Sequence, residues 1–228
     1  MIEHPPRLKL RRDFPRPTAE QVAAFRDVPT GFVADAMDGR GAMATAISPL
    51  PGLPGHVAGP ALVADNGPSD ILATLAAVHL VQPGDVVCAA ADGFQGAAAA
   101  GDQLMGMMRN AGAAGFVTDG PMRDLEGIQA VGVPVWCTGL NANSPYNDGP
   151  GTVGGAASIG GVTVASGDIV VADENGVVVV PHARIDAVID RLKAVTAAEE
   201  DLERKVADGL TAPLDLDAML ADGSAVEI

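Results

Sequence analysis

The chain has 228 residues, of which 48% are hydrophobic and 19% charged, a composition that can bury the core of one domain, alone or with a helical appendage. The formal net charge is −15 and the pI is near 4.4, which argues against a nucleic-acid backbone or an anionic membrane as partner, because both attract basic surfaces. No apolar run reaches the roughly 18 residues of a membrane span, and the opening segment lacks the apolar core of a secretory signal, so we expect a cytoplasmic protein.

The Pro-rich opening segment carries a basic cluster, which we interpret either as a solvated arm or as a strap on a neighbouring subunit. The cluster consists of Arg7, Lys9, Arg11 and Arg12. Further along, Thr18 and Gln21 form a capping box that predicts a helix over residues 19–27. The segment 48–59 is rich in Pro and Gly and predicts a loop, after which residues 60–64 begin an apolar sheet.

The cysteines and histidines do not indicate a metal site. Cys88 and Cys137 each lie in an apolar segment of strand length without CxxC spacing, which is typical of buried, reduced thiols. No two histidines have metal-ligand spacing, so zinc chemistry is not expected. They are His4, His56, His79 and His182. We interpret His79 as a structural residue in a helix that begins near Ser69.

Residues 83–114 have the pattern of a turn, a buried strand, a glycine-rich loop and a helix rich in Ala and Met. The strand is predicted over Val86–Ala90, and the helix ends at Gly112.

The next segment, GFVTDGPMRDL at residues 115–125, begins as a strand and ends in the adjacent pair Arg123 and Asp124. A guanidinium offers a planar fork of donors to a carboxylate or enolate, and a neighbouring carboxylate can hold a hard cation such as Mg²⁺ through oxygen. The alternative is structural: residues 119–120 make a turn, Pro121 starts a helix, and the pair lies on its exposed first turn.

The remaining elements are read from turn signals and periodicity. A strand over residues 133–137 precedes an irregular stretch through residue 155, which is either a lid or a subunit contact. Asn175 and Gly176 separate two β-branched runs and predict a hairpin. No GxGxxG motif follows a strand with a suitably spaced acidic residue, so a nucleotide cofactor is not expected. From His182 onwards the apolar residues have helical spacing.

Together, these segments resemble the RraA-like family, which includes ribonuclease regulators and metal-dependent aldolases that cleave 4-hydroxy-4-methyl-2-oxoglutarate. The matching positions are Gly84, Asp85, Asp92, Gly93, Gly101, Asp102, Asp119, Gly120, Arg123 and Asp124. The resemblance implies a layered α/β/α domain with a central mixed sheet over residues 1–180, and assembly into a homotrimer or homohexamer. The C-terminal helical tail, residues 181–228, is expected to pack on a neighbouring subunit.

The resemblance also implies a reaction. A 2-oxo acid would bind Mg²⁺ or Mn²⁺ anchored by Asp124, and cleavage between C3 and C4 would leave a pyruvate enolate stabilised by the metal and by Arg123. In the aldolases a glutamate of the tail reaches the neighbouring active site. Glu199 is the candidate here, with Glu200 as the alternative, although acidic residues of such a helix ordinarily form its solvated face.

The helix that opens at Gly101 is expected to bind the substrate carboxylate. The backbone N–H groups of Gln103 and Leu104 would point to this anion, because free amides at a helix N-terminus favour negative charge, and Gly101 would allow the close approach. Asp102 would receive or relay protons, and helix capping is an equally good explanation for it.

Other functions remain open from the sequence. Oxaloacetate decarboxylation fits the same chemistry, because it also yields a pyruvate enolate. One alternative is a metal-dependent lyase or hydratase for another oxo acid. Another is a regulatory binding protein, which would not need Arg123 and Asp124. Methyl transfer has no supporting nucleotide loop.

Overall fold

The computed structural model describes residues 6–228 and forms two compact units, which divide between Leu192 and Lys193. The first unit therefore extends beyond residue 180, where the sequence analysis ended the domain. The reason is that Ile185, Val188 and Leu192, at the start of the long C-terminal helix, are buried.

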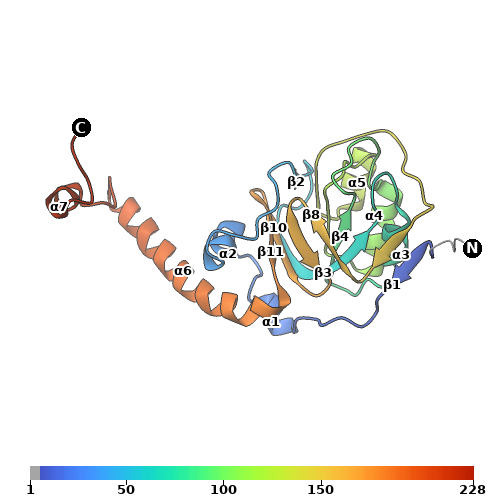
Figure 1. Cartoon of the computed structure of the whole chain (residues 1–228), viewed down its shortest axis with the longest axis horizontal. Coiled ribbons are helices and arrows are strands. Elements are labelled where there is room, and N and C mark those ends of the chain that lie inside the picture. Colours follow the sequence, from blue (N-terminus) through green and yellow to red (C-terminus); the bar gives the residue numbers. More distant parts are fainter. Residues whose placement is uncertain (1–5) are drawn as a thin grey trace, which may run out of the picture. The chain divides into compact units, whose positions relative to one another are not determined.

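The first unit is organised around a mixed sheet of nine strands (Figure 1). These strands are β1 (Leu8–Leu10), β2 (Ser48–Pro49), β3 (Val57–Asp65), β4 (Val86–Ala90), β5 (Gly115–Thr118), β6 (Val135–Cys137), β7 (Gly151–Val153), β10 (Ile169–Asp173) and β11 (Gly176–Val180). The central strands β3, β4, β5 and β6 are parallel neighbours. At the edges, β10 pairs antiparallel with β3 and β11, and β2 with β6. A separate hairpin consists of β8 (Ala156–Ile159) and β9 (Val162–Ala165).

Helices lie on both sides of this sheet. The helices of the described chain are α1 (Ala19–Ala23), α2 (Thr30–Ala36), α3 (Leu72–Ala77), α4 (Asp102–Ala111), α5 (Leu125–Val131), the 3₁₀ turn η1 (His182–Arg184), α6 (Ile185–Ala207) and α7 (Leu216–Asp222), and the end of α6 and all of α7 belong to the second unit. Helices α3, α4 and α5 cover one face (Figure 1). There Met105, Met108 and Ile128 share one buried hydrophobic cluster with Phe116 of β5. On the other side, α2 packs against β10 and β11, and the β8–β9 hairpin covers the centre. The predicted mixed α/β class is confirmed.

Local sequence signals located several elements well. The Thr18–Gln21 capping box is present, although α1 ends at Ala23 rather than at residue 27. The strand over Val86–Ala90 is confirmed, and Gly112 ends α4 at a φ of +94°. The loop predicted over 48–59 is wrong at both ends, because it contains β2 and the first residues of β3. His79 lies beyond α3, not within it, because that helix ends at Ala77.

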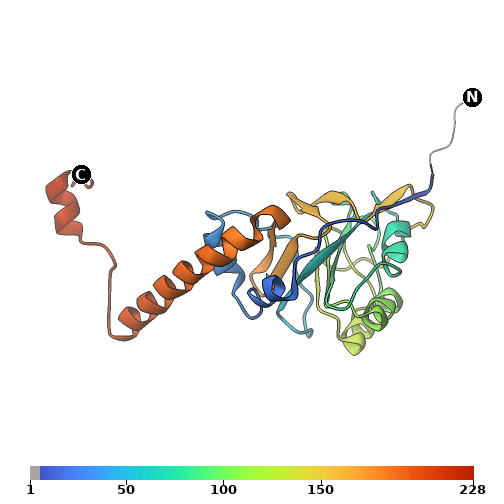
Figure 2. The same cartoon turned by 90° about the horizontal axis from the view of Figure 1, so that it is seen from below.

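The N-terminal segment is part of this sheet (Figure 2). Strand β1 pairs in parallel with β7, in the register Leu8 with Gly151. Further along, the Arg16 guanidinium forms two hydrogen bonds, of 2.7 and 2.9 Å, with the buried carboxylate of Asp85. The segment is therefore not a free arm, although the four basic residues of the cluster are exposed.

The predicted hairpin is confirmed as β10 and β11, with Asp173 opposite Gly176. The two residues between the strands are Glu174 and Asn175, so the turn lies one position earlier than the Asn175–Gly176 pair suggested. The Asp173 carboxylate is buried and accepts hydrogen bonds from the N–H and hydroxyl of Thr30, both 2.8 Å. Burial alone raises the pKa of Asp173, but the bonds from Thr30 and Asn175 outweigh it, so the pKa lies below its usual value.

The second unit, residues 193–228, contains the end of α6 and all of α7. Asp201 pairs with Arg204 and with Lys205 along α6, and the Asp215 carboxylate caps α7 at the N–H of Ala218. Several large apolar side chains are exposed in this unit, namely Leu202, Val206, Leu210, Leu214, Leu216, Val226 and Ile228. Within residues 6–228, no helix is both long and apolar enough to cross a bilayer.

Candidate active site

Three loops that follow β4, β5 and β6 meet at the carboxyl edge of the parallel strands, where α/β sheets commonly bind ligands. Isolated bridges connect the loops, Ala100 to Met122 and Met122 to Leu140. Beside them lies a cavity of about 410 Å³. Its lining consists of Ile71, Leu75, Ala100, Gly101, Asp102, Gln103, Leu104, Met107, Arg123, Asp124, Ser144, Pro145, Tyr146 and Asn147. All of the predicted site residues of the first unit therefore surround one cavity.

The N-terminus of α4 forms one side of the cavity. Gly101 is the N-cap, and the first N–H of the helical ladder is that of Met105, which donates to Gly101 O at 3.2 Å. The N–H of Gln103 donates to Asp102 Oδ1 at 2.6 Å. Two amides were expected to bind substrate. That of Gln103 is bonded to Asp102, whereas that of Leu104 lies before the first hydrogen bond of the helix. The N-cap is Gly101, so Asp102 is not the capping residue; from the first helical position its carboxylate accepts the amide of the next residue.

Arg123 and Asp124 form the facing side. Arg123 Nε lies 3.2 Å from Asp124 Oδ2, and both side chains are partly exposed. Helix α5 begins at Leu125, and Asp124 precedes it at a φ of +61°. The structural alternative, in which Pro121 starts a helix, is wrong because Met122 bridges to Ala100 and Leu140 instead, and the helix begins only at Leu125.

Two glycines let these side chains approach the helices. A Cβ on Gly101 would lie 2.5 Å from Asp124 Oδ2 and 3.2 Å from Arg123 Nε. A Cβ on Gly127 of α5 would collide with the Asp102 carboxylate. Both carboxylates can therefore lie this close to helix backbone only because glycine has no side chain.

The third wall comes from the irregular stretch after β6. Ser144 Oγ accepts a hydrogen bond of 2.6 Å from Arg123 Nη1. Ser144 was not among the predicted site residues, and no local signal could have found it, because a serine in an Asn- and Pro-rich stretch is ordinary loop composition.

Other motif residues serve the fold rather than the cavity. The buried Asp119 carboxylate accepts the N–H groups of Ala91 and Gly93 at 2.7 and 2.9 Å and so shapes the loop after β4. Burial raises the pKa of Asp119, and the charge of Asp92 adds to this, while the two N–H bonds oppose it. Asp119 and Asp92 also line a second cavity, of about 730 Å³, whose lining includes no cationic side chain. The cavity beside Arg123 is the better candidate for an anionic ligand.

The donor set suits a hard cation. Asp102 and Asp124 both line the cavity with carboxylate oxygens, and Mg²⁺ is commonly held by one or two carboxylates together with water and substrate oxygens. Among residues 6–228, no three His, Cys, Asp or Glu side chains are grouped to hold a metal by themselves, and His4 lies outside this range. The cysteines do not contribute, because Cys88 and Cys137 are buried and burial raises the pKa of both thiols.

Glu199 and Glu200 lie on α6 in the second unit. Their approach to an active site of another subunit stays a prediction.

Comparisons with known proteins identify the family of this chain. A model of the RraA-like family, described as Aldolase/RraA, matches residues 30–179. The chain is 35% identical over 191 residues to a protein of Halalkalibacterium halodurans named "Putative 4-hydroxy-4-methyl-2-oxoglutarate aldolase", covering 84% of this chain and 90% of that one.

Solved structures show the same fold. The crystal structure of Streptomyces coelicolor RraAS2, described as an unusual member of the RNase ES inhibitor RraA protein family, has a TM-score of 0.74 and 29% identity, over 83% of this chain and 100% of that one. An uncharacterized protein from Pseudomonas syringae pv. tomato has a TM-score of 0.76 at 24% identity, over 87% and 93% of the two chains. Since the family model spans most of the first unit, the chain belongs to the RraA-like family.

Proposed function

We propose that this protein is a divalent-metal-dependent aldolase that cleaves a 4-hydroxy-2-oxo acid of the 4-hydroxy-4-methyl-2-oxoglutarate type and releases pyruvate. The observation that carries the proposal is the Arg123–Asp124 pair, which lies against Gly101 at the N-terminus of α4 and lines the same cavity as this helix start. The named activity of the Halalkalibacterium halodurans relative supports the substrate class.

Arg123 is the one cationic side chain in the lining of this cavity. Because the whole chain carries a formal charge of −15, a dianionic substrate depends on Arg123, on the α4 N-terminus and on a bound cation for local attraction. Asp124 would hold Mg²⁺ or Mn²⁺, with Asp102 nearby. When bound, the cation supplies a Lewis acid for the keto group of the substrate.

The protein groups have separable roles in bond cleavage. The Leu104 N–H and the α4 N-terminus bind the substrate carboxylate, with Gly101 permitting its approach. As the C3–C4 bond breaks, its electron pair moves into the pyruvate enolate, and Arg123 stabilises the developing negative oxygen. Asp102, whose Oδ1 already accepts the Gln103 N–H, accepts or relays the proton that the 4-hydroxyl group loses.

Decarboxylation of oxaloacetate follows from the same groups. Loss of carbon dioxide from C4 also places an electron pair in a pyruvate enolate, so Arg123 stabilises an equivalent charge. We expect both activities in one site, and both should disappear when the divalent cation is removed with EDTA. Pyruvate release from the two substrates, with Mg²⁺, Mn²⁺ or EDTA, tests the proposal.

A regulatory role is the second candidate, supported by the likeness to RraAS2. A regulator binds a ribonuclease through its surface and does not need the cavity. Inhibition of a ribonuclease by wild-type protein and equally by an Arg123→Ala variant, without any pyruvate release, would favour this role.

We further propose a cytoplasmic homotrimer or homohexamer in which Glu199, or otherwise Glu200, completes the site of a neighbouring subunit. Light scattering measures the assembly. Co-expressed Asp124→Ala and Glu199→Ala chains should regain part of the activity that each lacks alone, because mixed assemblies contain some intact sites. No recovery would refute the shared site.

A further inference from the structure

The loop from β6 to β7 holds the Arg123 side chain in a defined orientation. Arg123 Nε lies 3.2 Å from Asp124 Oδ2, and Nη1 donates to Ser144 Oγ at 2.6 Å. Nη2 has no partner within the part of the chain that the structure describes, so it is available to an oxygen of the substrate. One nitrogen of the guanidinium is thus hydrogen-bonded to Ser144, a second is ion-paired with Asp124, and the third can bind the substrate.

The position of Ser144 depends on the residues that follow it. Tyr146 is bridged to Asp70, and its main chain is bonded on both sides: its N–H donates to Ser69 O at 2.7 Å, and its carbonyl accepts from Ile71 N–H at 2.9 Å. The loop is therefore attached to the segment before α3 two residues after Ser144.

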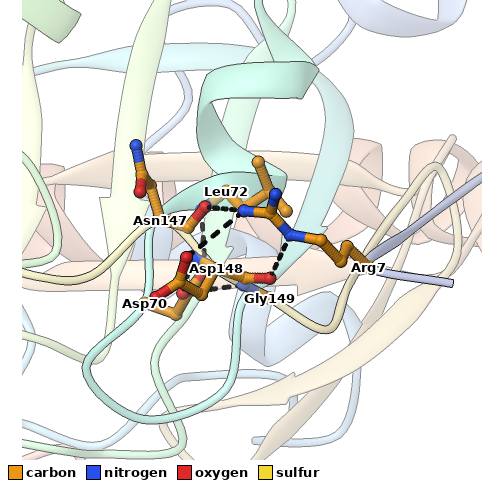
Figure 3. Close-up of polar contacts among 6 residues, drawn as sticks. All are labelled: Arg7, Asp70, Leu72, Asn147, Asp148 and Gly149. Atoms are coloured by element: carbon orange, nitrogen blue, oxygen red, sulfur yellow. Dashed lines mark hydrogen bonds and ion pairs between the residues drawn. The ribbon is translucent and has the colours of Figure 1, made fainter. Parts of the chain in front are cut away.

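Asp70 reinforces this attachment with its side chain (Figure 3). Its Oδ2 accepts the N–H groups of Asp148 and Gly149 at 2.8 and 2.9 Å, and its Oδ1 accepts the N–H of Leu72 at 2.8 Å. One carboxylate therefore connects the start of α3 to the loop. Carboxylate acceptors form stronger bonds with N–H groups than neutral acceptors do.

Arg7 holds the same segment from the N-terminal side (Figure 3). Its Nε donates to the carbonyl of Asp148 at 2.7 Å and its Nη2 to the carbonyl of Asn147 at 2.8 Å. A Cβ on Gly149 would collide with the Arg7 carbonyl, so these two backbones are in direct contact.

We propose that Ser144 is a positioning residue for Arg123 and that Asp70 keeps Ser144 in place. This inference rests on the proposed function, because the oriented Arg123 guanidinium is expected to stabilise the enolate that forms in the reaction. A donor that is already oriented requires no reorganisation energy when negative charge develops on the substrate. Ser144 should therefore affect kcat more than KM.

The first test compares Ser144→Ala with Ser144→Thr. We expect kcat for pyruvate release to fall about tenfold in Ser144→Ala, which corresponds to about 1.4 kcal/mol, with little change in KM. Ser144→Thr retains a hydroxyl and should recover most of the rate. Ser48→Ala removes an exposed hydroxyl outside this cavity and is the matched control. Wild-type kcat in Ser144→Ala, or no recovery in Ser144→Thr, would overturn the assignment.

The second test concerns Asp70. Asp70→Ala removes both acceptor oxygens, so the amides of Asp148 and Gly149 lose their shared partner. Hydrogen exchange of the peptide covering residues 144–150 should become faster, and kcat should fall as in Ser144→Ala. Unchanged exchange together with unchanged kcat would remove Asp70 from the proposal and leave only Ser144.

A binding measurement separates this inference from the proposed function. Oxalate resembles the pyruvate enolate, and calorimetry with Mg²⁺ measures its affinity without any turnover. If the wild type releases no pyruvate but binds oxalate about tenfold more tightly than Ser144→Ala does, the proposed reaction is wrong and the positioning role stands. If oxalate binds both proteins equally, or binds neither, the positioning role is wrong.

Discussion

Replacing Gly101 with Ala tests the geometry of the site without challenging the fold. Gly101 has φ −136° and ψ −172°, extended values that an L residue adopts without strain. Its substitution by Ala makes a poorer N-cap but restricts the unfolded chain, and these two effects oppose each other. We expect the free energy of unfolding to change by no more than about 1 kcal/mol.

The effect on activity should be far larger. The new Cβ would lie 2.5 Å from Asp124 Oδ2, whereas ordinary contacts begin near 3.4 Å, so the carboxylate must move by 3.4 − 2.5 = 0.9 Å. Arg123 Nε, at 3.2 Å, is also displaced slightly. A misplacement of about 1 Å in a catalytic group costs about 100-fold in rate. We therefore expect kcat/KM for pyruvate release to fall about 100-fold.

Gly106→Ala is the matched control, because it makes the same change in the same helix. A Cβ there would meet only Val131 Cγ2, at 3.9 Å. It should leave kcat/KM unchanged and stabilise the protein by about 0.5–1 kcal/mol, as expected for Ala in place of Gly within a helix. Pyruvate release and urea unfolding measure both variants. Wild-type activity in Gly101→Ala would refute the argument from close approach.

Three further predictions concern stability and thiol chemistry. Arg16→Ala leaves the buried Asp85 carboxylate unpaired and should lower the free energy of unfolding by about 3–5 kcal/mol in urea titrations; a change below about 1 kcal/mol would contradict a buried ion pair. Because the folded pKa of Asp173 is lowered, this group stabilises the protein above its unfolded pKa, and the contribution is lost as pH falls through the folded pKa. Asp173→Asn should therefore lose about 1–3 kcal/mol at pH 7 and less at pH 3, and an equal loss at both pH values would argue against the linkage. Cys88 and Cys137 should react with a disulfide reagent only after unfolding, and rapid labelling of the native protein would disagree with their burial.

The sequence predicts those parts of the fold that depend on neighbouring residues. The Thr18–Gln21 capping box, the strand over Val86–Ala90 and the left-handed Gly112 at the end of α4 each involve a few consecutive positions. Turn chemistry and periodicity act over such distances.

The site was predictable in part, because the resemblance supplied residues and the carboxyl ends of parallel strands share one edge. Gly101, Asp102, Arg123 and Asp124 do surround a single cavity. The backbone of Asp124 was not predictable, since a φ of +61° for a non-glycine residue is held by surrounding contacts rather than by local preference.

The supports of the site depend on contacts between distant parts of the chain. Ser144 lies 21 positions from Arg123, Asp70 lies 78 from Asp148, and Arg7 lies 141 from Asp148. The pairing of β1 with β7 creates the last of these contacts. A single sequence contains no periodicity that connects such positions, so these residues appear only once the fold is known.

Pyruvate release by wild type and by Asp124→Ala, with Mg²⁺ and with EDTA, tests the central claim most directly. Asp13→Ala, which removes an exposed carboxylate outside the cavity, controls for the loss of one negative charge. We predict Mg²⁺-dependent release from 4-hydroxy-4-methyl-2-oxoglutarate by the wild type and by Asp13→Ala, and none by Asp124→Ala. Release that persists in EDTA or in Asp124→Ala would contradict the account.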